Sequence, residues 1–478
     1  MEKEKLLKSN ILYGALKGIV SVLFPLITFP YITRVLGVYN VGVYNFVFSV
    51  VSYFILFSGL GIGLYAIREG AVIRNDSTKI NEFCSEMLSI NIISSIISYI
   101  LLCILIVIVP EFSKYYILFM ILALEIFLKT IELEWIFSIY EDYKYITIRS
   151  VIINLISLVL LFLFVRKDGD INIYAIISVI AYGGSNILNL IYSRYYVHFD
   201  LLKKRNLRKH IKPIMKFFVF SLTATIYINS DITLLGLISG TYYVGIYSVS
   251  TKIYTVIKMI IASMIAISIP RLSNLYGQKQ RQEFYDTAKK IYCFMLSILI
   301  PVTIGLIILH KEIILFLSSS DYLAATPSLI ILSIALMFCI CGYFWAQCIL
   351  IPMNKENTVV KITIISAILN VVLNLIAIPL FKETGAAVTT VISELIVFIY
   401  CFYVGKNKTN LKFPILFFIK IIFGSIAIPI SYLVAKIVFT NITYIIILTV
   451  LLSVIIYISI EILLKNEVVK DFICIKKI

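Results

Sequence analysis

Charged side chains stand inside long apolar runs of this sequence, where they are costly. Eight of them are candidates for chemistry, namely Lys17, Glu125, Lys129, Glu132, Asp231, Lys252, Lys258 and Glu394. Insertion scales put an Arg, Lys or Asp at the centre of a spanning helix at about 2.5–3.5 kcal/mol, so such residues usually face a protein interior or a watery cavity. The chemistry that suits them is the binding of charged solutes and the uptake of protons or cations.

Glu125, Lys129 and Glu132 are spaced at i, i+4 and i+7, which predicts that they share one face of a helix. An i,i+4 bridge would lower their cost. Because two carboxylates compete for one lysine, we expect the surplus carboxylate to take up a proton or cation. Glu125 and Lys129 are therefore candidate ion-coupling residues, and the alternative is a purely structural set of ion pairs.

Asp231 and Lys252 flank the connection from Gly240 to Tyr243 at equal spacing, nine residues from it on either side. On antiparallel neighbouring helices the two residues would lie at similar depth. One interpretation is a buried structural pair. In the other, Asp231 takes up a proton or cation and Lys252 becomes available to an anionic substrate.

Lys17 belongs to a polar stripe with Tyr13, Ser21 and Thr28, within about 40° of one line at 100° per residue. The stripe favours a face turned to a cavity, where Lys17 would bind an anionic substrate. Snorkelling toward the near end of the helix is the alternative.

Signatures of enzymes and metal sites are absent from the sequence. There is no Gly-rich phosphate loop, nucleophile elbow or metal-ligand spacing, so we expect no catalytic residue, metal or cofactor. The eight cysteines are scattered without a Cys-x-x-Cys pair and are expected to be buried small hydrophobic residues.

The composition of the chain predicts that these charged residues lie on membrane-spanning helices. Of the 478 residues 61% are hydrophobic and 14% charged, with a mean hydropathy of +1.01, which excludes a single water-soluble core. Apolar windows predict an all-α polytopic membrane protein of about 14 helices. Their expected ranges are 10–33, 41–66, 84–109, 115–139, 146–165, 171–193, 213–239, 243–269, 288–309, 327–351, 358–380, 385–404, 413–436 and 441–464.

The basic residues favour one orientation of these helices. With a cytoplasmic N-terminus, 30 Lys and Arg fall in inside connections and six in outside ones. This bias predicts an even number of helices and both termini in the cytoplasm. It also indicates that the net charge of +16 orients the helices in the membrane rather than binding nucleic acid. The connection with Lys203, Lys204 and Arg205 is either a topology determinant or a patch for anionic lipid headgroups.

An internal repeat divides the chain. A shift of 203 residues lays Gly37, Val41, Gly42 and Tyr44 over Gly240, Val244, Gly245 and Tyr247, and Arg68 over Arg271. A shift of 216 lays Ser150 and Asn154 over Ser366 and Asn370. We expect two parallel six-helix halves, 1–200 and 201–404, and an accessory segment 405–478 with helices 13 and 14 and a basic cytoplasmic tail. Parallel repeats are typical of transporters with a site between the halves.

Several blocks resemble Wzx-type polysaccharide flippases of the multidrug/oligosaccharidyl-lipid/polysaccharide exporter superfamily. They are FPYITRVLG at 29–37, VGVYNFVFS at 41–49, WIFSIYEDYKYITIR at 135–149, DITLLG at 231–236, VGIY at 244–247, IPRLS at 269–273 and GAAVTTVISEL at 385–395. One departure is Val38-Tyr39-Asn40, which replaces the glycine-proline-rich turn usual after the first helix.

The resemblance implies two six-helix lobes in a V around a cationic central cavity. It implies a flippase of the bacterial cytoplasmic membrane that moves an undecaprenyl-pyrophosphate-linked oligosaccharide for O-antigen, capsule or exopolysaccharide from the cytoplasmic to the outer leaflet. Arg34 and Arg68 match recurring family arginines, so the expected substrate-binding set is Lys17, Arg34, Arg68, Lys252 and Arg271. Expected partners are membrane lipids, the polysaccharide polymerase and the chain-length machinery, without nucleic acid.

The sequence leaves two other functions open. A small-molecule or other lipid exporter of the same superfamily would differ in cargo rather than in fold. A membrane polymerase or glycosyltransferase is disfavoured, because outside connections such as 240–243 and 381–384 are almost bare turns.

Overall fold

The computed structural model describes residues 2–200, 206–407, 409, 415–464 and 466. The basic connection at Lys203, Lys204 and Arg205 and most of the predicted cytoplasmic tail lie outside these residues. Helices make up almost all of the described chain, and no strand occurs in it. Among the described residues, 11 helices are long and apolar enough to cross a membrane. The chain is therefore an all-α polytopic membrane protein.

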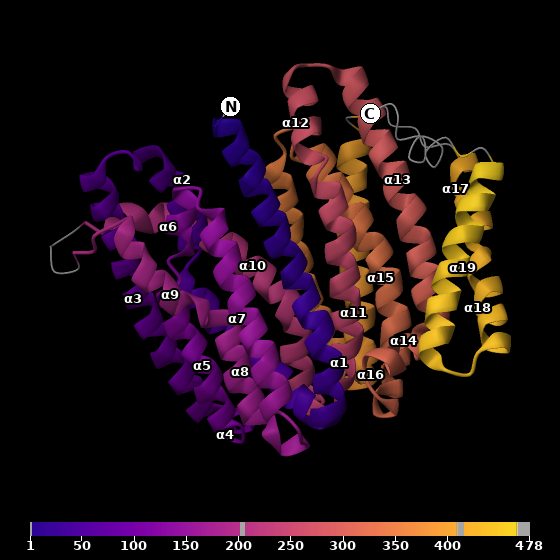
Figure 1. Ribbon diagram of the computed structural model, residues 1–478, viewed down its shortest axis with the longest axis horizontal. Helices are drawn as coiled ribbons and strands as arrows, with labels where there is room; N and C mark the ends of the chain where they lie inside the picture. The colour runs from indigo at the N-terminus through magenta and orange to yellow at the C-terminus, as the bar shows by residue number, and fades with distance from the viewer. Residues whose placement is uncertain (1, 201–205, 408, 410–414, 465, 467–478) are drawn as a thin grey trace. The chain divides into compact units, whose positions relative to one another are not determined.

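The elements follow one another along the chain with short connections (Figure 1). They are α1 (Glu2–Gly59), α2 (Ile62–Ile73), α3 (Ser77–Ile108), α4 (Pro110–Ser113), α5 (Tyr116–Thr130), α6 (Glu134–Ile139), α7 (Tyr143–Phe164), η1 (Asp168–Asp170), α8 (Ile171–Gly183), α9 (Ser185–Tyr192), η2 (Ser193–Tyr195), α10 (Arg208–Ile238), α11 (Thr241–Ala266), α12 (Ile269–Gly277), α13 (Arg281–Ile308), α14 (His310–Leu317), η3 (Ser320–Ala325), α15 (Thr326–Phe344), η4 (Trp345–Leu350), α16 (Glu356–Lys406), α17 (Ile415–Ser425), α18 (Ala427–Val438) and α19 (Ile442–Leu463).

Two of the long helices hold two passes each. The backbone of α1 turns at Gly37 (φ 69°), and that of α16 turns at Lys382 (φ 53°). Figure 1 shows α1 leaving the end that carries the N-terminus, reversing at the opposite end, and returning toward α2. Each of these two turns adds one membrane crossing to the 11 apolar helices, and α5 together with α6 adds one more. The total agrees with the predicted number of about 14 helices.

Several predicted helices are broken into shorter ones. The range 41–66 is interrupted where Leu60 and Gly61 both have positive φ, 44° and 72°. The range 115–139 is interrupted between Thr130 and Glu134, and 171–193 at Gly184. Apolar length predicts where a chain crosses a membrane, but it contains no signal for such local breaks.

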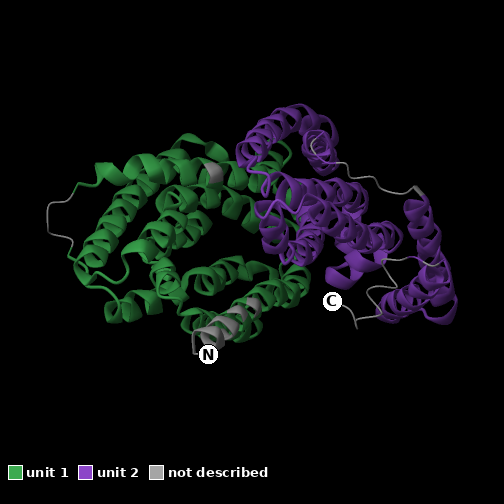
Figure 2. Cartoon of the chain, turned by 90° about the horizontal axis from the view of Figure 1, so that it is seen from above, with its two compact units in different colours: residues 1–245 green, residues 246–478 purple. Residues whose placement is uncertain are grey.

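The chain separates into two compact units, Met1–Gly245 and Ile246–Ile478 (Figure 2). The division falls after Gly245 rather than after residue 200, because α10 packs along α1 and α2 within the first unit. The predicted segments 1–200, 201–404 and 405–478 describe repeats in the sequence, which the division into compact units does not test. They therefore remain a prediction.

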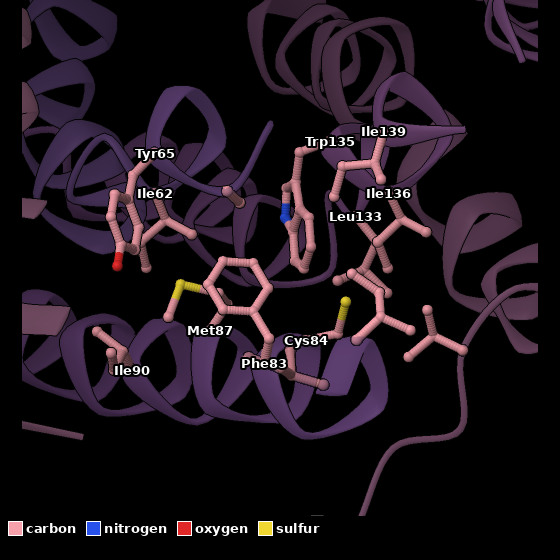
Figure 3. Packing of buried hydrophobic residues seen from close by; sticks show 14 of the residues in the cluster. Ile62, Tyr65, Phe83, Cys84, Met87, Ile90, Leu133, Trp135, Ile136 and Ile139 are labelled. Atoms are coloured by element: carbon pink, nitrogen blue, oxygen red, sulfur yellow. The ribbon is translucent and has the colours of Figure 1, made fainter. Parts of the chain in front are cut away.

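An apolar cluster holds one end of the first unit together. It joins α2, α3 and α6 through residues such as Ile62, Phe83, Met87, Trp135 and Ile136, all of them buried (Figure 3). The start of α3 is capped by Asp76, which accepts a hydrogen bond from the Lys79 N–H at 3.1 Å. The cluster fixes α2 and α6 beside the polar cavity described next.

Candidate functional site

A polar cavity of about 500 Å³ lies within the first unit. Its wall comes from α1, α2, α3, α5, α6, α8, α9 and α10, together with the turns that follow α1 and α5. The lining residues are Phe48, Ser52, Ile55, Leu56, Gly59, Gly61, Ile62, Gly63, Leu64, Asn91, Glu125, Lys129, Glu132, Trp135, Tyr182, Gly183, Asn186, Ser221, Thr225 and Asn229. Amides, hydroxyls, aromatic rings and aliphatic side chains therefore surround three charged side chains among the helices of this unit.

Glu125, Lys129 and Glu132 meet in this cavity, but in a different way from that expected. Because α5 ends at Thr130, Glu132 lies beyond the helix rather than on its face. Lys129 forms an ion pair with Glu132, and the predicted bridge to Glu125 is not the pair observed. Glu125 is buried, and its Oε1 accepts no hydrogen bond from any described residue. The surplus carboxylate of the three is thus Glu125.

Gly59 gives the Lys129 side chain its space. A Cβ built on Gly59 would lie 3.0 Å from Cε of Lys129. Since this distance is tighter than most real Cβ contacts, any larger residue at 59 would press on the lysine near its charged end. The absence of a side chain at Gly59 therefore sets the space that is available to the end of the Lys129 side chain.

A second charged cluster joins α1, α6 and α7. Lys17 Nζ lies 2.5 Å from Glu134 Oε1, and Arg149 Nη2 donates to Glu134 Oε2 at 2.6 Å. Arg149 is only 3% exposed, its Nε and Nη1 have no partner among the described residues, and its guanidinium lies 5.6 Å from the Tyr145 ring. Two cations share one carboxylate, which leaves the cluster with a formal charge of +1.

Sequence reasoning missed Glu134 and Arg149 as site residues. Arg149 is the last residue of the block at 135–149, and Glu134 directly precedes that block, so neither residue is marked by its spacing as part of a charged site. Lys17 was predicted to face a cavity or to snorkel. In the structure it pairs with another helix, which no spacing within α1 indicates.

A third cluster, also missed, surrounds Glu86 of α3. Glu86 is 1% exposed and lies 2.7 Å from His210 Nε2 and 2.9 Å from Lys209 Nζ, both on α10. Tyr65 of α2 lies 2.8 Å from the other ring nitrogen of His210. These contacts tie the first turn of α10 to α2 and α3.

The second unit has charged clusters of its own. Glu394 of α16 is buried, accepts a hydrogen bond from Tyr254 Oη at 3.0 Å, and lies 3.6 Å from Lys258 Nζ. Glu394 therefore packs against α11.

The pair α18–α19 is attached to the same unit through α14. Glu312 accepts a hydrogen bond from Tyr432 Oη at 2.7 Å, and Lys436 Nζ lies 3.5 Å from the same carboxylate.

The five predicted substrate-binding residues are spread along the chain. Lys17 and Arg34 lie on α1 roughly 25 Å apart, at 1.5 Å per residue. Arg34 is exposed, and Arg68 on α2 pairs with Glu69 at 2.8 Å and lies 5.3 Å from the Phe217 ring.

Lys252 is half-buried on α11, and Arg271 is exposed on α12, both in the second unit. Of the predicted coupling residues, Asp231 is buried on α10, while Glu125 and Lys129 share the cavity. The roles assigned to all eight remain predictions.

Solved structures of transporters share this fold. The lipid II flippase MurJ in an inward closed conformation is 18% identical, with a TM-score of 0.72 over 96% of this chain and 100% of that one. An inward-facing multidrug resistance transporter of the MATE family and MOP superfamily is 14% identical, with a TM-score of 0.58 over 81% of this chain and 98% of that one.

Relatives in sequence include proteins whose names refer to O-antigen and capsular polysaccharide. A protein of Escherichia coli K12 described as a candidate O-antigen transporter is 25% identical over 84% of this chain and 97% of its own length. The capsular polysaccharide biosynthesis protein CapF of Staphylococcus aureus is 25% identical over 83% of this chain and 99% of its own.

Two family models match the sequence. The MatE model matches residues 217–376, and the model described as polysaccharide biosynthesis protein matches residues 7–276. Because the second match covers more than half of the 478 residues, the chain belongs to the polysaccharide biosynthesis protein family.

Proposed function

We propose that this protein is a flippase for a lipid-linked oligosaccharide. The cargo is an undecaprenyl-pyrophosphate-linked repeat unit of O-antigen, capsule or exopolysaccharide, moved from the cytoplasmic to the outer leaflet by alternating access. One observation carries the proposal: a polar cavity with three charged side chains lies among the spanning helices of a chain that is similar to an O-antigen transporter over 84% of its length. Charged residues within membrane-spanning segments often mark the path of a polar solute or an ion.

The cargo has two chemical parts that need different surroundings. Its pyrophosphate is an anion, for which Lys17, Arg34, Arg68, Lys252 and Arg271 are the proposed ligands. Its lipid tail stays in hydrocarbon. Lys17 is supported by its place in a cluster of net positive charge. The V-shaped arrangement of two lobes that alternating access requires is part of the proposal.

The driving force is proposed to come from an ion gradient, with Asp231, Glu125 and Lys129 as coupling residues. Asp231 on α10 and Glu125 on α5 are both buried acidic side chains. A buried carboxylate is a natural place for a proton or cation, because neutralisation removes the cost of burying its charge.

We propose that the protein lies in the bacterial cytoplasmic membrane with both termini in the cytoplasm. This orientation rests on the excess of Lys and Arg in the connections on one side. The membrane lipids are direct partners, and the polymerase and chain-length machinery that receive the translocated repeat are proposed as further ones.

The proposal is tested by gene replacement in strains that lack their own flippase and make repeat units of known structure. Expression is expected to restore surface polysaccharide for at least one repeat unit and to clear lipid-linked repeats from the inner leaflet. Normal export in a null mutant of the natural host would refute the proposal.

The MatE match favours a second candidate, a small-molecule exporter of the same superfamily. Its cargo would be a drug-like or lipid molecule rather than a lipid-linked glycan. Expression that confers resistance to such compounds, without any effect on surface polysaccharide, would select this candidate.

A further inference from the structure

Glu125 lies in the cavity of the first unit without a hydrogen-bond partner. Its side chain is 7% exposed, and Oε1 accepts no hydrogen bond from any residue that the structure describes. A carboxylate buried in this way loses its hydration and gains nothing in return, whereas a protonated carboxyl is neutral and has a donor of its own. The unpartnered oxygen points to a carboxyl that holds a proton.

The groups that face Glu125 do not neutralise it. Within the described lining of the cavity Lys129 is the single cation, and it is paired with Glu132. From the other packed elements, α1 brings the phenol of Tyr44 and α8 that of Tyr182, both close enough to Glu125 for electrostatic interaction. The lining residues of α3, α9 and α10 are amides and hydroxyls, which carry no charge. With both carboxylates ionised, the cavity has a formal charge of −1.

Lys129 stands between the two carboxylates. It follows Glu125 by one helical turn, a spacing at which side chains form ion pairs, and it precedes its present partner Glu132 by three residues. Gly59 leaves its stem free of a neighbouring Cβ. Both carboxylates therefore lie at sequence spacings that the flexible stem of Lys129 can span, one at i−4 and the other at i+3.

We propose that this cavity is a proton-binding site centred on Glu125, and that release of the proton transfers Lys129 from Glu132 to Glu125. A metal cation is a poorer occupant, because it needs several oxygen ligands at once and the second carboxylate is held by Lys129. The inference deepens the proposed function by naming the coupling ion and its site. It rests on the proposed function only in the claim that the proton drives transport, since proton binding to Glu125 is measurable without cargo.

The chain contains a natural reporter for the test. It has two tryptophans, of which Trp135 lines the cavity and Trp345 is buried in the second unit. In the full-length W345F variant in lipid nanodiscs, Trp135 is the only source of tryptophan emission. Its fluorescence is recorded against pH in buffers with potassium or sodium as the cation.

We expect one titration of Trp135 emission in W345F and its loss in W345F/E125Q, because glutamine has the shape of the protonated acid but does not titrate. Glu132→Gln frees Lys129 for Glu125, so the midpoint should move at least about one unit toward acid. The matched control is Glu312→Gln, which removes another buried carboxyl in the second unit and should leave the titration unchanged.

A titration that persists in E125Q, or emission that does not change with pH, overturns the inference. So does a response to sodium at constant pH, which would assign a metal cation. If W345F fails to fold, the carbonyl band of a protonated carboxyl, compared between wild type and E125Q by infrared spectroscopy, answers the same question. A titration in a protein that exports no glycan rejects the proposed function alone, and export without a titration rejects this site alone.

Discussion

Gly42 and Gly245, which the internal repeat lays over one another, are in contact. A Cβ built on Gly42 would lie 2.8 Å from the backbone nitrogen of Gly245 and would overlap the carbonyl oxygen of Thr241. A Cβ on Gly245 would overlap the carbonyl oxygen of Val38. The matched glycines therefore mark a close approach between the backbones of α1 and of the start of α11 within the first unit, next to the turns at Gly37 and Gly240, which both have positive φ.

The first prediction concerns this contact. Gly42→Ala should destabilise the protein by about 2 kcal/mol or more, because the clash is with backbone atoms that cannot move aside. Thermal unfolding of the purified protein in detergent measures the loss. Gly305→Ala in α13 is the control, since a Cβ there meets no heavy atom within 4 Å and alanine favours the helix by roughly 0.5–1 kcal/mol. Equal stability of the two variants would contradict the close packing.

The second prediction concerns the cluster around Glu134. Glu134→Gln leaves Arg149 buried without its carboxylate, which should cost about 3–5 kcal/mol. Glu141→Gln removes the partner of Arg74 at 2.9 Å, but both side chains are more than one third exposed, so the loss should stay below about 1 kcal/mol. Unfolding temperatures of the two variants decide between a structural ion pair and a dispensable one.

The third prediction separates the site from the fold. Gly59→Ala should press on Lys129 and lower export several-fold, while the free energy of unfolding changes by less than about 2 kcal/mol. Gly63→Ala is matched to it, because Gly63 lines the same cavity but has no heavy atom within 4 Å of an added Cβ. Surface polysaccharide at equal expression is the measurement, and similar export by both variants would exclude a role for the Lys129 position.

The fourth prediction concerns the proposed anion ligands. Lys252→Ala or Arg34→Ala should impair export more than Lys436→Ala, whose side chain is half-exposed and is held 3.5 Å from Glu312. The physical reason is that an anionic headgroup loses a cation only in the first two variants. Export is compared in a flippase-deficient strain at equal protein level, and equal effects of all three would remove Lys252 and Arg34 from the site.

The sequence by itself determined the class of this protein. Apolar length predicts the membrane crossings, since each requires about 20 residues whatever their order. The repeat indicated the correspondence of Gly37 with Gly240, and both are turns with positive φ in the structure. Glu125, Lys129 and Glu132 were also recognised together, because a charge inside an apolar run is conspicuous.

Only the tertiary structure decided which charges meet. The end of α5 at Thr130 assigns Lys129 to Glu132 and leaves Glu125 without a partner, although spacing alone favoured a bridge between Glu125 and Lys129. Lys17 and Arg149 share a carboxylate on α6 that lies 117 positions from Lys17 along the chain. Periodicity orders residues within one helix, whereas contacts between helices depend on kinks, breaks and packing that arise only when the whole bundle folds.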